Sequence, residues 1–233
     1  MIDILLAGVG GQGTVLAAKV LAQAAQNKGW QVRTAETIGM AQRGGNVTSH
    51  VRMGSNGEAV FSPLITPGTA DIVIALEPGE AARALPFLAP GGVLVTATTA
   101  IQPVTAALSS QPYRAGDVVA ALANSLHAEA SREQAAEVAI APNAKANTQD
   151  AEAPGVEGNP VPLFVPVDDE ALVREAGASS RKSLNMMLLA VAVAQGRVPL
   201  SLDEVKDAVR ACVKPQFVAM NLAAIDTAVA NFG

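Results

Sequence analysis

The sequence predicts an α/β fold with a central, mostly parallel sheet, helices on both faces, a Rossmann-like start, an inserted hairpin and a helical C-terminal section. Two continuous apolar runs, residues 4–7 and 70–76, are typical of strands buried on both faces of a parallel sheet. A segment of helical composition follows each run. Residues 181–230 then contain three helical segments in succession, which makes the C-terminal section helical.

The composition indicates a large core and a mildly acidic surface. Half of the 233 residues are hydrophobic and the net charge is −5, which disfavours nucleic-acid binding because that requires a basic surface. Cys212 is the single cysteine, so this chain alone cannot form an internal disulfide or hold a cysteine-ligated iron–sulfur cluster. His50 and His127 lack metal-ligand spacing, and we expect no metal site. With no leader-like start and no membrane-length apolar run, a cytoplasmic protein without membrane contact is expected.

The N-terminal segment carries a glycine-rich turn between a predicted strand and a predicted helix that begins at Thr14. The glycines of this turn are Gly8, Gly10, Gly11 and Gly13. Three of them match the G-x-G-x-x-G spacing, in which a ligand can approach the backbone closely and the N–H groups at the helix start favour a phosphate or carboxylate. Two interpretations stay open: the glycines allow tight packing, or they contact an anionic ligand or a partner.

The next segment supports an alternative function and then departs from it. Residues 31–35 read as a second strand that ends near Glu36, at the position where a dinucleotide-binding fold holds a ribose hydroxyl. An NAD-binding oxidoreductase or a dinucleotide-binding sensor is therefore the alternative, unless Glu36 is simply an exposed strand end. Residues 37–45 read as a loop instead of the expected helix, which weakens this alternative.

Residues 46–53 alternate in polarity and predict a strand with one more polar face. Ser49 and His50 are neighbours in this strand and point to opposite faces, so a nucleophile–base pair is not expected. The turn signal Ser55-Asn56-Gly57 and the residues 59–61 predict the inserted hairpin and its return strand.

The remaining chain predicts further strands and helices within a single domain over residues 1–233. A stretch rich in proline, asparagine and glycine, residues 141–160, predicts a flexible insertion. The other predicted elements are a helix from Pro78 to about Leu88, a strand over 93–98, a helix over 117–130, a strand over 161–167, a helix capped by Asp168 or Asp169, and helices over 181–195, 202–212 (capped by Ser201) and 216–230.

Three stretches together resemble one family. They are GVGGQG (residues 8–13), AQRGGNVTSHVR (41–52) and SLNMMLLAVAV (183–193). In this combination and order they resemble the gamma-type subunit or domain of 2-oxoacid:ferredoxin oxidoreductases, and most of all the small (beta) subunit of indolepyruvate ferredoxin oxidoreductase. The last helix departs from the family pattern because no glycine follows soon after residues 221–224.

The resemblance implies a non-cofactor-bearing subunit of an enzyme that oxidatively decarboxylates a 2-oxoacid to an acyl-CoA and passes electrons to ferredoxin. Thiamine diphosphate, Mg²⁺ and iron–sulfur clusters are then expected in a large partner subunit, with coenzyme A as a co-substrate that the glycine turn could contact. The chain is expected to be inactive alone, and it could pair with itself when isolated.

The resemblance also implies a substrate or interface loop at the subunit boundary near the active site. Its residues are Gln42, Arg43, Gly44, Gly45, Ser49 and His50. Arg43 is a planar, permanently charged donor suited to phosphate or carboxylate, and the two glycines after it would admit another backbone or a ligand. No residue of this chain is expected to be catalytic.

Overall fold

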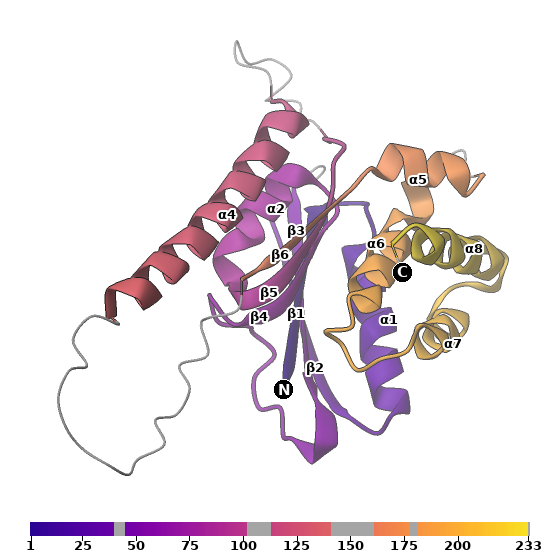
Figure 1. Ribbon diagram of the computed structural model, residues 1–233. Helices are drawn as coiled ribbons and strands as arrows, with labels where there is room; N and C mark the ends of the chain where they lie inside the picture. The colour runs from indigo at the N-terminus through magenta and orange to yellow at the C-terminus, as the bar shows by residue number, and fades with distance from the viewer. Residues whose placement is uncertain (40–44, 102–112, 141–160, 178–180, 233) are drawn as a thin grey trace.

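In the computed structural model, a six-stranded sheet lies between two groups of helices, as Figure 1 shows. The described residues are 1–39, 45–101, 113–140, 161–177 and 181–232. The strands and helices in chain order are β1 (Ile2–Val9), α1 (Thr14–Asn27), β2 (Gln31–Ile38), β3 (Asn46–Gly54), β4 (Ala70–Ala75), α2 (Pro78–Ala84), β5 (Leu88–Ala97), α4 (Ala115–Ile140), β6 (Leu163–Val167), α5 (Asp169–Glu175), α6 (Leu184–Ala194), α7 (Leu202–Cys212) and α8 (Pro215–Phe232). The predicted α/β class is confirmed.

The sheet has the strand order β2-β3-β1-β4-β5-β6. Strands β1, β4, β5 and β6 pair in parallel, whereas β3 is antiparallel to both of its neighbours, β1 and β2. The loops that follow β1, β4, β5 and β6 therefore leave the sheet at one common edge, which we call the carboxyl edge. In open α/β sheets this edge is where ligands bind.

The inserted hairpin exists, but its predicted position was wrong. The antiparallel pair is β2 with β3, and Ser55–Gly57 form a single turn of 3₁₀ helix. Residues 59–61 are not part of a strand. The physical reason is that β3 already pairs with β1 on one side and β2 on the other, so it has no free edge to accept a return strand.

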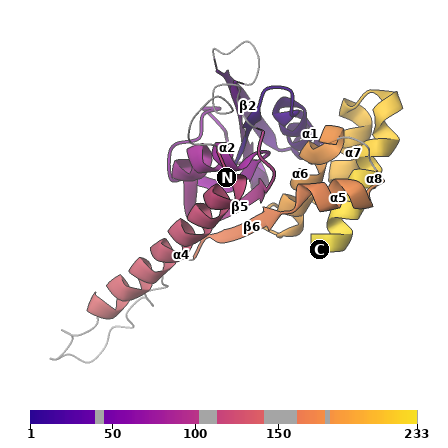
Figure 2. The same ribbon diagram turned by 90° about the horizontal axis from the view of Figure 1, so that it is seen from above.

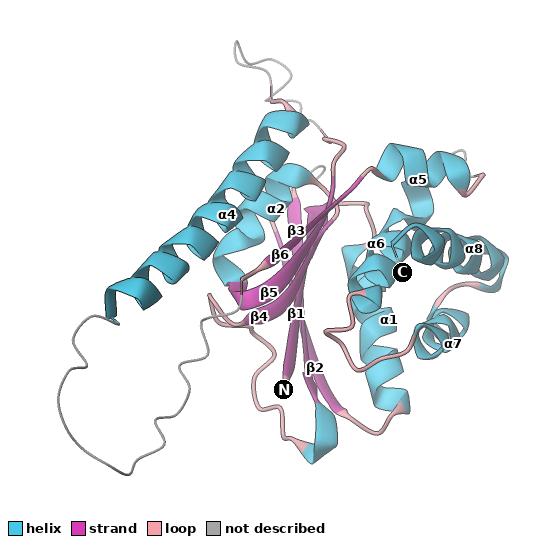
Figure 3. Cartoon of the chain, in the orientation of Figure 1, coloured by secondary structure: helices cyan, strands magenta, loops and turns pink. Residues whose placement is uncertain are grey.

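One face of the sheet is covered by α1 and the C-terminal helices, as Figure 3 shows. Helix α6 lies at the centre of this layer, and ten of its eleven residues are buried. It has no polar stripe because the sheet, α1, α7 and α8 all contact it. Four predicted features of this layer are confirmed, namely the Asp168 cap on α5, the Ser201 cap on α7, and helices α6 and α8.

The opposite face is covered by α2 and α4, which pack on Leu5, Val73 and Leu94. Helix α4 begins two residues earlier than predicted and runs ten residues further, and Figure 2 shows that it extends away from the rest of the molecule. Helix α2 is shorter than predicted because residues 85–87 form a 3₁₀ turn before β5. The predicted insertion at 141–160 lies outside the described residues.

None of the helices in the described ranges is both long enough and apolar enough to cross a membrane.

Candidate functional site

The glycine loop, residues 8–13, connects β1 to α1 at the carboxyl edge of the sheet, and its glycines have two different roles. A Cβ at Gly8 would lie 2.9 Å from Gln12 Oε1, and a Cβ at Gly13 would lie 2.6 Å from Asn185 Nδ2. Gly13 also has φ +84°, in the left-handed region that favours glycine. Gly8 and Gly13 are therefore needed for packing. A Cβ at Gly10 or Gly11 would meet nothing closer than 3.6 Å, so these two leave the backbone open.

Side-chain and backbone hydrogen bonds fix the shape of the loop. Gln12 accepts a hydrogen bond from the Val9 N–H at 2.6 Å and donates through Nε2 to the Leu76 carbonyl at 2.7 Å. The Gly10 N–H donates to the Gly45 carbonyl at 2.9 Å. The loop is thus tied both to the end of β4 and to the chain that enters β3.

A pocket of about 340 Å³ lies against the open side of the glycine loop. We call it the glycine-loop pocket, and its lining consists of Gly10, Gly11, Gln12, Ile101, Arg181, Lys182 and Leu184. Helices α1 and α6 both begin beside it, and Asn185 Nδ2 joins them by donating to the Gly13 carbonyl at 3.0 Å. The N-terminal ends of helices carry partial positive charge, and two cationic side chains add to it. The pocket is therefore suited to an anion.

Arg181 is held beside this pocket by Asp169, the first residue of α5. Asp169 Oδ2 lies 2.6 Å from Arg181 Nη2, in an ion pair whose alignment falls short of a hydrogen bond. The other oxygen, Oδ1, accepts from the N–H groups of Thr98 and Thr99 at 3.1 and 2.9 Å. Asp169 is fully buried, whereas the Arg181 side chain is 29% exposed. This pair was not predicted from the sequence, although two aspartates after a predicted strand and two basic residues before an apolar helix are signals that could have pointed to it.

A second buried carboxylate, Glu77, follows β4 at the same edge. Its Oε2 accepts from the Glu80 N–H at 3.0 Å and so caps α2, and its Oε1 accepts from the Tyr113 hydroxyl at 2.6 Å. Burial, and next the adjacent Glu77, raise the pKa of Tyr113. Glu77 is not in the lining of the glycine-loop pocket, and its contacts indicate a role in fixing the start of α2.

The predicted substrate or interface loop is only partly visible. Gln42, Arg43 and Gly44 lie outside the described residues. Gly45 is half-buried and contacts the glycine loop through its carbonyl group. Ser49 is fully buried, and none of the described residues is a hydrogen-bond partner for its hydroxyl group.

His50 lies in β3 and is only 6% exposed, although the strand was predicted to have a more polar face. Its Nδ1 accepts from the Ile65 N–H at 3.2 Å, and its ring meets Phe87 edge-on with 6.0 Å between the ring centroids. Burial lowers the pKa of His50. These contacts indicate a packing role for the ring, and His50 does not line the glycine-loop pocket.

Glu36 is exposed on β2, where it pairs with Ser49 of β3. In a dinucleotide-binding fold the acidic residue ends a strand that pairs directly with the first strand, on the side away from the fourth strand. Here the antiparallel β3 occupies that place, so Glu36 is separated from the glycine loop by a whole strand. The structure therefore does not support the NAD-binding alternative.

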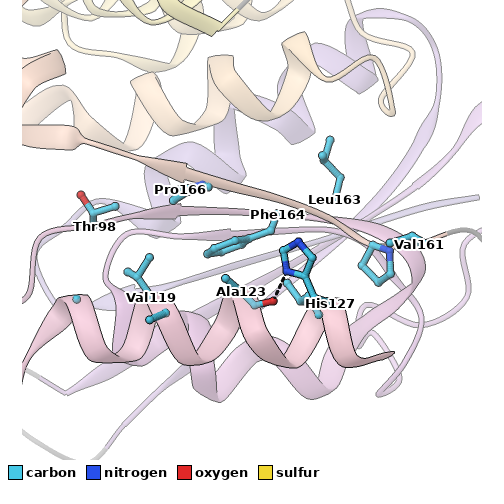
Figure 4. A pocket seen from close by; sticks show the side chains of 12 residues that line it. Thr98, Val119, Ala123, His127, Val161, Leu163, Phe164 and Pro166 are labelled. Atoms are coloured by element: carbon cyan, nitrogen blue, oxygen red, sulfur yellow. Dashed lines mark hydrogen bonds between the residues drawn. The ribbon is translucent and has the colours of Figure 1, made fainter. Parts of the chain in front are cut away.

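A larger pocket of about 620 Å³ lies between α4 and β6, as Figure 4 shows. Apolar side chains such as Val119, Leu163 and Phe164 form most of its lining. His127 is the single titratable side chain in the lining, and its Nδ1 lies 2.6 Å from the Ala123 carbonyl oxygen. None of the other described residues in the lining is charged, so the described part of this pocket does not show the converging polar groups of the glycine-loop pocket.

Metal binding finds no support in the side chains that the structure places. Within the described ranges, no three histidine, cysteine, aspartate or glutamate residues stand close enough together to hold a metal ion.

Comparison with known protein sequences gives matches along nearly the whole chain. The family model described as pyruvate ferredoxin/flavodoxin oxidoreductase matches residues 3–231. The indolepyruvate oxidoreductase subunit IorB of Archaeoglobus fulgidus is 30% identical over 224 residues, covering 96% of this chain and 92% of that protein. The protein of the same name from Pyrococcus horikoshii is 29% identical over 227 residues, covering 97% and 94%.

Solved structures show the same fold. The gamma subunit of a keto/oxoacid ferredoxin oxidoreductase from Geobacter sulfurreducens aligns with a TM-score of 0.60 and 20% identity over 99% of this chain and 97% of that chain. The 2-oxoglutarate:ferredoxin oxidoreductase of Magnetococcus marinus, solved with 2-oxoglutarate, coenzyme A and succinyl-CoA bound, aligns with a TM-score of 0.60 and 18% identity over 98% of this chain and 30% of that chain. The relatives are subunits of oxidoreductase complexes, and from the match over residues 3–231 the chain belongs to the pyruvate ferredoxin/flavodoxin oxidoreductase family.

Proposed function

We propose that the chain is the small, non-cofactor-bearing subunit of an indolepyruvate-type 2-oxoacid ferredoxin oxidoreductase. In this role it takes part in the oxidative decarboxylation of a 2-oxoacid to an acyl-CoA, with electrons passed to ferredoxin. The similarity to proteins named indolepyruvate oxidoreductase subunit IorB over 92% and 94% of their length supports this assignment.

The observation that carries the chemical part of the proposal is the basic, glycine-lined pocket at the carboxyl edge. Two helix starts, Arg181 and Lys182 surround the open backbone of Gly10 and Gly11. A volume of about 340 Å³ suits the diphosphate and its immediate surroundings better than a whole coenzyme A molecule. The proposed occupant is the diphosphate group of coenzyme A. A structural relative solved with coenzyme A bound is consistent with this choice.

Thiamine diphosphate, Mg²⁺ and the iron–sulfur clusters are proposed to lie in a large partner subunit. The thiamine cofactor would supply the carbanion chemistry and the clusters the electron transfer. The single cysteine of the sequence is too few for a cysteine-ligated iron–sulfur cluster, and no group of three acidic, cysteine or histidine side chains among the described residues could hold Mg²⁺, which supports this division. The proposed contribution of this chain is to bind and orient coenzyme A and to enclose the active site beside the partner subunit.

The loop of residues 42–45 is proposed to face the partner subunit. The hydrogen bond from the Gly10 N–H to the Gly45 carbonyl joins the end of this loop to the glycine loop. A partner that contacts residues 42–45 would thus lie next to the proposed coenzyme A site, which is where an active-site boundary is required.

Co-expression with the proposed large partner subunit tests the assembly. We expect the two chains to co-purify and to reduce ferredoxin when indolepyruvate and coenzyme A are supplied. Failure to associate, together with unchanged indolepyruvate oxidation by the large subunit, would contradict the proposal.

Calorimetric titration of the complex with coenzyme A and with NAD tests the ligand. Coenzyme A should bind, and Arg181→Gln and Lys182→Gln should each weaken it roughly threefold to tenfold by removing one cation from the pocket. Lys214→Gln is the matched control, because it removes an exposed lysine outside the pocket lining. Tight NAD binding without coenzyme A binding would refute the ligand assignment.

A further inference from the structure

Asp169 is a carboxylate with 0% exposure that does not line the glycine-loop pocket but contacts a residue that does. Burial of a carboxylate is costly unless hydrogen bonds or opposite charge compensate it. Asp169 has both kinds of partner, and each of its two oxygens has its own. Because the two oxygens have different partners, each of them can be considered separately.

The first oxygen anchors Asp169 to the sheet. Oδ1 accepts from two successive backbone N–H groups, those of Thr98 and Thr99, directly after β5. Thr98 also donates its N–H to the Val167 carbonyl at 3.0 Å, which joins the ends of β5 and β6. The carboxylate therefore has a fixed position and orientation at the carboxyl edge.

The second oxygen holds Arg181 by one nitrogen only. Oδ2 lies 2.6 Å from Nη2, and the remaining guanidinium N–H groups have no hydrogen-bond partner within the part of the chain that the structure describes. A guanidinium carries five N–H groups in a planar array that suits phosphate oxygens. Arg181 lines the pocket while its Nη2 end is buried against Asp169.

We infer that Asp169 is a positioning residue: it holds the Arg181 guanidinium so that its remaining N–H groups face a phosphate-bearing ligand in the glycine-loop pocket. An arginine side chain loses roughly 2 kcal/mol of conformational entropy when it becomes fixed. The ion pair with Asp169 fixes it before the ligand arrives, so the ligand binds more tightly. This inference deepens the proposed function and depends on it.

Lys182 cannot replace this arrangement. It is exposed, and its ammonium group is a single charge on a flexible side chain. It attracts an anion without fixing the direction of approach, and it has no contact with Asp169 among the described residues. The directed donor in the pocket is therefore Arg181, and its direction depends on Asp169.

The test uses Asp169→Asn in the full chain, titrated with inorganic pyrophosphate and with coenzyme A. Asparagine keeps the oxygen that accepts from Thr98 and Thr99, but its amide nitrogen cannot accept from Arg181. Affinity for both compounds should fall about tenfold. Asp168→Asn is the matched control: it removes the same charge one residue earlier and can still cap α5 through the Ala171 N–H. Affinity in that variant should not fall.

A double-mutant cycle separates positioning from a general effect on the fold. If Asp169 acts through Arg181, the variant Asp169→Asn/Arg181→Gln binds pyrophosphate as Arg181→Gln alone does. Additive losses in the double variant would overturn the inference. Should Asp169→Asn fail to fold, Arg181→Lys replaces it: a lysine can keep the ion pair but cannot also present a planar donor array, so it should bind pyrophosphate as weakly as Arg181→Gln. Wild-type affinity in Arg181→Lys would overturn the inference.

The two proposals fail in different ways. If the wild-type chain and its complex bind neither pyrophosphate nor coenzyme A, both the ligand assignment and the role of Asp169 are wrong. If the wild type binds and Asp169→Asn binds equally well, the role of Asp169 is wrong and the ligand assignment stands.

Discussion

Gly13 combines two constraints that no other residue type satisfies. Its φ of +84° is strained for any side chain, and Asn185 occupies the space that a Cβ would need. Gly29 has a similar φ of +77° but nothing within 4 Å of a Cβ. A substitution at Gly29 therefore tests the backbone strain alone, whereas a substitution at Gly13 tests the strain together with the steric conflict with Asn185.

Replacement of Gly13 by alanine should lower the free energy of unfolding by about 2–4 kcal/mol, because the strain of the left-handed conformation adds to the displacement of Asn185. Gly29→Ala should cost about 1–2 kcal/mol, from the strain alone. Urea denaturation measures both. Equal losses in the two variants would mean that Asn185 moves aside without cost.

His50 should make the stability of the protein depend on pH. Burial places its folded-state pKa below the ordinary value of 6.5, so the unfolded chain binds a proton more readily than the folded chain between those two values. Stability should therefore be lost as the pH falls below about 6.5. In His50→Asn, whose side-chain oxygen can still accept from the Ile65 N–H, this part of the loss should be absent.

Urea denaturation of the wild type and of His50→Asn at pH 7.5 and at pH 5 gives the loss of stability in each protein. The difference between the two losses is the contribution of His50, because the titration of the carboxylates is common to both proteins. An identical decrease in the two proteins would show that His50 binds protons equally in the folded and unfolded states, so that burial does not lower its pKa.

At the scale of elements, α6 connects the core to the site. Its buried surface packs against the sheet, α1, α7 and α8, and its N-terminal end carries Leu184 and Asn185 to the glycine loop. Because ten of its residues are buried, a loss of packing anywhere along it displaces the pocket as well.

Truncation of Leu188, which is fully buried in the middle of α6, should lower the free energy of unfolding by about 2–5 kcal/mol, since the Leu188→Ala change leaves a cavity. Leu163→Ala removes the same atoms from a side chain that is 41% exposed on β6, and it should cost less than about 1.5 kcal/mol. Thermal unfolding of both variants tests the difference, and a milder effect at Leu188 than at Leu163 would contradict the packing described for α6.

Local sequence patterns predict the elements of this fold well, because strands, helices and caps depend on neighbouring residues. The strand, glycine turn and helix over residues 2–27 appear as expected, and so does the Ser201 cap, which the structure completes with Glu204. Which strands pair with each other depends on residues far apart in the sequence, so local patterns do not predict it. Ser55-Asn56-Gly57 has the composition of a hairpin turn, yet strand pairing elsewhere leaves β3 no free edge.

The site was predicted in part for the same reason. The glycine loop carries its signal in six consecutive residues, whereas Arg181 lies about 170 residues away in a three-residue 3₁₀ turn with no recognisable pattern. Asp168 or Asp169 was expected as a helix cap, and Asp168 is the cap, whereas the contact of Asp169 with Thr98 and Thr99 depends on how β5 and β6 are placed. A single sequence carries no information about such contacts.

At the scale of the whole molecule, the charges are distributed unevenly. The chain has a net charge of −5, yet the described residues that line the glycine-loop pocket include two cations and no acidic side chain. An anionic ligand is thus attracted at one place and repelled elsewhere.

The isolated chain should show no turnover when it receives indolepyruvate, coenzyme A and an electron acceptor, because its residues do not fit the groups that carry out the redox chemistry. The assay is reduction of a viologen dye by the purified chain, with and without the large subunit. Sustained reduction by the chain alone would contradict the proposed division of work between the subunits.

The position of β1 between β3 and β4 has a consequence for biosynthesis. β1 is an apolar strand, and both of its neighbours in the sheet, β3 and β4, are translated after it. Until translation has passed Ala75, at least one edge of β1 has no partner strand, and its backbone N–H and C=O groups stay unpaired. A chaperone that binds the nascent chain during this interval would prevent its aggregation with other nascent chains on the same messenger RNA.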